Sequence, residues 1–260
     1  MDSVSAGVTG PRRTLGLAGD PHRFTPIASV GKLLVGLAAL VAVEEGTVDL
    51  DEPAGPEGST VRHLLGHASG LAFDSDRSIA SPGRRRIYSN TGIERFAEHL
   101  AARAGMSFEE YLRLGVLEPL GMARTELRGS PAGAVWSTVA DLLVFSRELL
   151  GPTLVSAETL AQAIRPQFPD LAGVLPDLGR FDPNAWGLTF EIRDEKQPHW
   201  TGRRNSPETF GHFGGSGSFL WVDPRARLAT VVLAERDFGP WALETWPAFS
   251  DAVLERYGPG

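Results

Sequence analysis

Ser29 and Lys32, three positions apart, place a nucleophile and a base within reach of each other. They lie at the start of an apolar stretch, residues 33–43, which together with Gly46 predicts a buried helix that begins at Ser29. Residues three apart at a helix start share one face, so the two side chains can touch. A hydroxyl is a weak nucleophile and a buried amine loses its proton readily, so the pair indicates nucleophilic catalysis.

The scarcity of lysine supports this interpretation. Lys32 and Lys196 are the only lysines among 25 basic residues, the others being arginine. Arginine stays protonated and cannot act as a base, whereas lysine can. The alternative is coincidence, because a Ser-x-x-Lys spacing arises by chance with a probability of about one in eight in this composition.

A second motif, Tyr88-Ser89-Asn90, precedes a helix that Thr91 and Glu94 are expected to start. A phenol can move a proton and an amide can donate to a substrate carbonyl. The alternative is a turn that follows a packed Tyr88. The preceding run 84–86, three arginines, is expected to be solvated rather than to bind an anion.

A third motif spans residues 212–217, His-Phe-Gly-Gly-Ser-Gly, at the end of a predicted strand. Repeated glycine lets a substrate lie against the backbone and exposes N–H groups that an oxyanion hole needs. The alternative is a tight turn between two strands, with His212 packed in the core.

The elements around these motifs predict an α+β protein. Its antiparallel sheet is built from both termini and flanked by helices, with a mostly helical region inserted between them. Residues 1–50 and 185–260 are expected to form the sheet-containing part and residues 51–184 the helical part, as one interleaved catalytic unit with the active site between them. The predicted strands are 4–8, 12–18, 186–192, 209–213, 218–222 and 228–234, and the last helix is 241–257.

The three motifs, in this order, resemble the serine β-lactamase and penicillin-binding-protein superfamily, including class C-like β-lactamases and family VIII-type carboxylesterases. The resemblance extends to residues 25–28, 61–71 and 137–142 and covers nearly the whole chain. It implies a β-lactamase/transpeptidase-like fold and an acyl-enzyme on Ser29. It also implies roles for the other motif residues: proton handling by Lys32 and Tyr88, substrate binding by Asn90, His212, Phe213 and Gly214, and an oxyanion hole formed by the N–H groups of Ser29 and Gly215.

One departure from that family bears on the substrate. The third motif reads His-Phe-Gly where the resembled β-lactamases have Lys-Thr-Gly, and Phe213 offers no hydroxyl to a drug carboxylate. The sequence therefore predicts a serine hydrolase of small esters or amides, similar to carboxylesterases. The alternatives are a β-lactamase, a D-amino-acid-specific peptidase, and a catalytically silent relative that binds a ligand in the same cleft.

The resemblance implies a small ester, amide or lactam as the substrate, and the composition argues against other partners. A net charge of −7 and a pI near 5.4 argue against nucleic acid, and the stretch 33–43 is too short to cross a membrane. The chain has no Cys, and His63 and His67 lack the Glu of a zinc motif, so neither metal nor cofactor is expected. Residues 1–7 do not resemble a signal peptide, which predicts a cytoplasmic protein; no protein partner can be identified.

Overall fold

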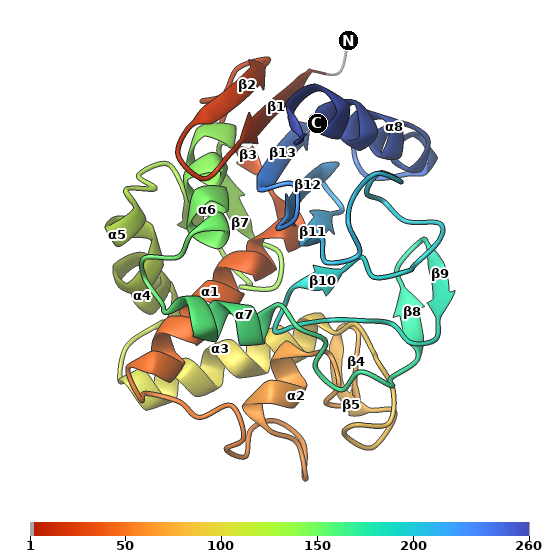
Figure 1. Cartoon of the computed structure of the whole chain (residues 1–260). Coiled ribbons are helices and arrows are strands. Elements are labelled where there is room, and N and C mark those ends of the chain that lie inside the picture. Colours follow the sequence, from red (N-terminus) through yellow and green to blue (C-terminus); the bar gives the residue numbers. More distant parts are fainter. Residues whose placement is uncertain (1–2, 260) are drawn as a thin grey trace.

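A computed structural model describes residues 3–259, and its centre is a six-stranded antiparallel sheet (Figure 1). The strand order is β10-β11-β12-β13-β1-β2, so strands from both ends of the chain meet where β1 pairs with β13. The strands are β1 (Val4–Thr9), β2 (Thr14–Ala18), β10 (Glu191–Ile192), β11 (Phe210–Gly214), β12 (Ser218–Asp223) and β13 (Leu228–Ala234). The predicted α+β fold, with a sheet assembled from both termini, is confirmed.

Helices cover both faces of this sheet, which explains why β12 and β13 are buried along their whole length. On one face α1 (Gly31–Glu44) and α6 (Val139–Leu150) pack against the sheet; α6 approaches so closely that a Cβ on Gly7 would lie 2.6 Å from Leu143. On the other face lies α8 (Pro240–Tyr257), whose Trp246 and Val253 join a second apolar cluster. The helix α1 is buried over nearly all its length and runs through the middle of the molecule.

The register of β11 and β12 decides which residues of the third motif face α1. His212 pairs with Leu220 and Phe213 with Phe219. Neighbouring residues of a strand point to opposite faces. Leu220 belongs to the apolar cluster around α1, whereas Phe213 and Phe219 belong to the cluster around α8. His212 and Phe213 therefore point to opposite faces of the sheet.

In the inserted region helices contribute more residues than strands do. Ser107 and Thr138 cap α4 (Phe108–Leu112) and α6 through the N–H groups of residues three further on. The predicted helix start at Thr91 is wrong, because Ser89, not Thr91, accepts the N–H of Gly92 and caps α3 (Asn90–Ala104). The elements of this region are α2 (Val61–Leu65), β4 (Leu71–Ala72), β5 (Ser75–Ser78), α3 (Asn90–Ala104), α4 (Phe108–Leu112), a π-helical turn (Arg113–Leu117), α5 (Glu118–Leu120), β6 (Glu126–Leu127), β7 (Val135–Ser137), α6 and α7 (Ala157–Ala163).

Two further local predictions are wrong. Residues 186–192 do not form one strand, because Thr189 has a positive φ of 67° and the Gly187 N–H bonds to Phe190 O, which turns the chain before β10. In the run 84–86, Arg86 is buried and donates to backbone carbonyls, among them Asn184 O at 3.1 Å. The remaining strands are short: β3 (Thr25–Pro26), β8 (Gly173–Leu175) and β9 (Gly179–Phe181).

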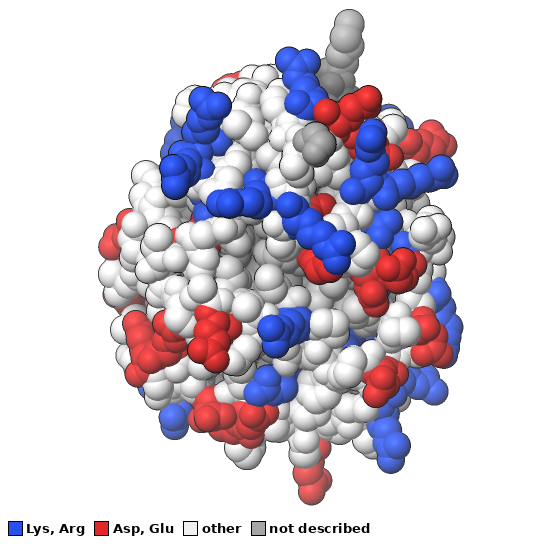
Figure 2. All heavy atoms as spheres, in the orientation of Figure 1, with Lys and Arg blue, Asp and Glu red and all other residues white. Residues whose placement is uncertain are grey.

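The surface carries both charge signs. Figure 2 shows basic and acidic side chains interspersed over the displayed face. Among residues 3–259, no helix has both the length and the apolar character needed to cross a membrane.

Candidate active site

Ser29 lies in a short 3₁₀ turn, Ala28–Val30, that leads directly into α1. The predicted helix start is thus a tighter turn followed by the α-helix. Ala28 has a positive φ of 46°, an unfavourable conformation for a residue with a side chain, of a kind that concentrates at functional sites. The turn is held from both sides, because Ile27 donates to Val135 O at 2.9 Å and its own carbonyl accepts from Ser218 Oγ at 2.8 Å.

Lys32 lies in the first turn of α1, and its side chain is fully buried. Its Nζ is 3.0 Å from Ser29 Oγ and donates to Asn90 Oδ1 at 2.7 Å and to the Ala132 carbonyl. A neutral amine has two N–H donors and one lone pair. Because the two carbonyl oxygens only accept, they take both donors and leave the lone pair directed at Ser29.

Burial lowers the pKa of Lys32 from 10.5 to about 7, although Asp74 and Glu94 oppose this shift. An ammonium group loses hydration when it is buried, and only a nearby negative charge can compensate. At pH 7 about half of the Lys32 population is therefore neutral, against roughly 0.03% for an amine with the ordinary value. The amine next to Ser29 can accept a proton near neutral pH.

Tyr88 and Asn90 complete the group around Ser29. The Tyr88 hydroxyl lies 2.8 Å from Ser29 Oγ, and Lys32 Nζ lies 4.9 Å from the centre of the Tyr88 ring. Burial raises the pKa of Tyr88 above its usual range, so the phenol keeps its proton and donates it to Ser29 Oγ. Asn90 is the first residue of α3, and its Oδ1 faces Lys32 because its Nδ2 donates to Asp74 at 2.8 Å.

His212 borders this group as a neutral imidazole. Its ring lies 5.6 Å from that of Tyr88, and burial, together with the charge of Lys32, lowers its pKa to about 3. The Phe213 carbonyl can only accept, so Nδ1 carries the proton at 2.5 Å from it and Nε2 is an acceptor. His212 therefore offers a substrate a lone pair and not a positive charge.

His67 and Trp186 also belong to this site, although no motif identified them. The His67 ring lies 4.7 Å from that of Tyr88 and 4.8 Å from that of Trp186, and burial keeps the pKa of His67 well below its usual value. Buried ring nitrogens of His67, Trp186 and His212 have no hydrogen-bond partner among the described residues. Such groups are costly to leave unpaired, so they are available to a ligand.

The rest of the third motif has buried and exposed positions. Phe213 is 8% exposed and packs with ring centres 4.8 Å from Phe238 and 6.3 Å from Trp246. These contacts place the Phe213 ring in the apolar cluster around α8. Gly214 is required by close packing, since a Cβ there would lie 2.6 Å from Ile27 O, whereas a Cβ on Gly215 would meet open space.

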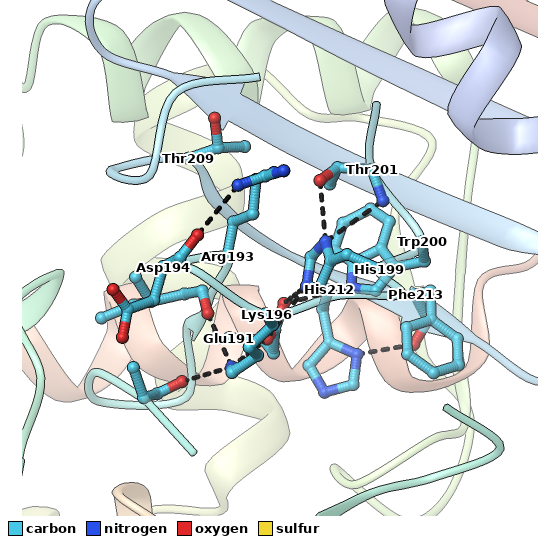
Figure 3. A network of polar contacts seen from close by, with 12 residues as sticks. Glu191, Arg193, Asp194, Lys196, His199, Trp200, Thr201, Thr209, His212 and Phe213 are labelled. Carbon is cyan, nitrogen blue, oxygen red and sulfur yellow. Dashed lines mark hydrogen bonds and ion pairs between the residues drawn. The ribbon is translucent and has the colours of Figure 1, made fainter. Parts of the chain in front are cut away.

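A buried charged network lies beside the strand that carries His212 (Figure 3). Glu191 accepts from Lys196, from His199 Nε2 at 3.0 Å and from Trp200 Nε1 at 3.0 Å. Burial raises the pKa of Glu191, but Lys196 and His199 outweigh it and hold that pKa at about 2. A cavity of about 810 Å³ lies next to this network, and none of the candidate residues around Ser29 lines it.

The fold and the order of motifs define the class: the chain belongs to the Beta-lactamase family, which matches residues 2–253. A β-lactamase from Mycobacterium bovis is 57% identical, covers 98% of this chain and 95% of its own, and superimposes with a TM-score of 0.97. Penicillin-binding protein 4* of Bacillus subtilis is 25% identical over 134 residues, which are 39% of this chain and 30% of that protein. EstCE1, a hydrolase with promiscuous acyltransferase activity, shares the fold with a TM-score of 0.74 at 15% identity, over 90% of this chain and 89% of its own.

Proposed function

We propose that this chain is a serine hydrolase that forms an acyl-enzyme on Ser29 and acts on small esters. The observation that carries the proposal is the environment of Lys32, a buried amine with a pKa of about 7 whose Nζ lies 3.0 Å from Ser29 Oγ. In the proposed reaction Ser29 attacks the substrate carbonyl while its proton passes to Lys32. The N–H groups of Ser29 and Gly215 stabilise the oxyanion that develops.

Collapse of the tetrahedral intermediate needs a proton for the leaving group. Tyr88 can supply it, because its hydroxyl touches Ser29 Oγ and its raised pKa keeps it protonated. Lys32, now protonated 4.9 Å from the Tyr88 ring, returns the proton to the phenol. The same pair then accepts a proton from the water that attacks the acyl-enzyme, which restores Ser29.

The preference for an ester follows from what surrounds Ser29. A β-lactam drug carries a carboxylate, and its recognition needs a cation or a hydroxyl close to the reacting centre. Here His212 is neutral and Phe213 packs toward α8, so neither side chain offers a carboxylate a positive charge or a hydroxyl. A neutral ester requires only the acyl pocket and the oxyanion hole.

A β-lactamase is the second candidate, because the relative at 57% identity is described as one. One preparation should therefore be assayed with p-nitrophenyl acetate, a D-amino-acid amide and a chromogenic cephalosporin. We expect the highest kcat/KM for the ester, and a preference for the cephalosporin would favour the second candidate. A fluorophosphonate should label Ser29, as mapped by mass spectrometry; modification of Ser216 or Ser89 instead would overturn the assignment of the nucleophile.

A further inference from the structure

Asp74 is a fixed carboxylate at the edge of the site around Ser29. Its Oδ1 accepts from Asn90 Nδ2 at 2.8 Å, and the Phe73 carbonyl next to it accepts from Asn90 N at 2.8 Å. The Phe73 ring stacks on Tyr88 with centres 5.8 Å apart. Residues 73 and 74 are therefore tied to the second motif by main-chain, side-chain and ring contacts.

The charge of Asp74 reaches the reacting groups. It raises the pKa of Lys32 and that of Tyr88, and among charged groups it has the largest influence on each. Asp74 has no ion-pair partner within residues 3–259. Arg95 contacts the same β4–β5 hairpin, but it pairs with Asp76 at 2.7 Å. The carboxylate next to Asn90 is thus outside any ion pair among these residues.

The groups of the described site balance this charge only in part. Lys32 is half neutral at pH 7, and His67 and His212 are both neutral because they are buried. Arg86 acts on His67, but its guanidinium is occupied by backbone carbonyls of other segments. The second acidic group that acts on Lys32 is Glu94, which adds negative charge.

We propose that Asp74 makes this site select substrates by charge: it favours acyl donors whose leaving group is cationic, accepts neutral ones, and disfavours those that carry a carboxylate. This inference rests on the proposed hydrolase function. Hydrogen-bond distances link Asp74 to Asn90, Asn90 to Lys32 and Lys32 to Ser29, and charges interact over a Debye length of about 8 Å at physiological ionic strength. The attraction or repulsion therefore acts on substrate capture, and added salt weakens it.

Three thioacetates of similar size test the charge preference. They are acetylthiocholine, which is cationic, 3,3-dimethylbutyl thioacetate, its neutral analogue, and S-acetyl-3-mercaptopropionate, which is anionic. The released thiol is read with a disulfide reagent, and the protein contributes no thiol because it has no Cys. We expect kcat/KM to fall from cation to anion by about tenfold at low salt, and by less at high salt.

Asp74→Asn keeps an oxygen that can accept from Asn90 and removes only the charge, so the cation-to-anion ratio should fall toward one. Asp76→Asn is the matched control, because Asp76 lies two residues from Asp74. Its carboxylate is paired with Arg95 and is not among the charges that shift the pKa of Lys32. The ratio is internal to each variant, so a change in its absolute rate does not confuse the result.

The outcomes separate the two proposals. An enzyme that hydrolyses all three thioacetates at equal rates, or prefers the anion, overturns the charge selection and leaves the hydrolase function standing. An unchanged ratio in Asp74→Asn assigns the selection to another group and overturns the role of Asp74. A protein that hydrolyses none of them, with Ser29 unlabelled by fluorophosphonate, overturns the hydrolase function and the inference that rests on it.

Discussion

The two lysines of this chain are both buried, yet their surroundings give them opposite roles. Lys196 pairs with Glu191, and the pKa of Glu191 is lowered to about 2. The glutamate is therefore ionised, and Lys196 is the cation of an ion pair. Lys32 touches a hydroxyl, an amide and a carbonyl, and its pKa falls to about 7. Burial lowers the pKa of both amines, but only Lys196 has a carboxylate partner that raises its pKa again and favours the ammonium form.

The largest effect that follows from this comparison is the loss of activity when Lys32 is replaced by Arg. Arginine keeps the positive charge but cannot accept the proton of Ser29, so we expect kcat/KM to fall by about 10²–10⁴, as for Lys32→Ala. Rates should be measured with p-nitrophenyl acetate, and far-UV circular dichroism should show a folded protein. A Lys32→Arg enzyme that keeps more than about a tenth of the wild-type rate would mean that charge alone is needed.

Lys196→Met tests the other half of the comparison. It leaves Glu191 buried without its strongest partner, so the free energy of unfolding should fall by about 3–5 kcal/mol in a urea titration. The control is Arg225→Met, which breaks an exposed pair with Glu208 and should change that free energy by less than about 1 kcal/mol. Equal effects in the two variants would contradict the structural role of Lys196.

What the sequence could reveal about the site depended on local spacing. Ser29 and Lys32 lie three residues apart, so their contact was predictable, whereas the approach of Asn90 and Ala132 to Lys32 is set by tertiary packing. Asp74 carries no motif, and only the contact with Asn90 reveals it.

The limits for the fold are similar. Continuous apolar residues and a turn predicted β12 and β13 almost to the residue, but strand order is a long-range property. Strand alternation offers a signal for the third motif, because His212 and Phe213 are neighbours and only one of them can face α1. That signal argues against a direct role of the Phe213 ring in substrate binding.

The pH dependence of activity should follow Lys32. Protonated Lys32 cannot accept the proton of Ser29, so kcat/KM should fall about tenfold per pH unit below an apparent pKa near 7 and level off above it. Burial disfavours the ammonium form in the folded state only. The unfolded chain therefore binds more protons between pH 7 and 10.5, and the Lys32 contribution to stability should rise with pH over that range. An acid limb above pH 9 would show that Lys32 is not the base.

The smallest effect concerns the two acidic groups that oppose the burial of Lys32. Asp74 and Glu94 raise the pKa of Lys32, with Asp74 the larger influence, so removing either charge lowers that pKa further. We expect Asp74→Asn to move the acid limb of kcat/KM to lower pH by less than about one unit, because Asp74 is exposed and water screens its charge. Glu94→Gln should move it less in the same direction, and Asp76→Asn, whose carboxylate is paired with Arg95, should not move it. The three profiles should be measured with a neutral ester at one ionic strength. A limb that moves to higher pH in Asp74→Asn would show that the main effect of Asp74 on Lys32 is to hold Asn90 in place. A loosened Asn90 would let water reach Lys32, which would raise its pKa and favour its ammonium form.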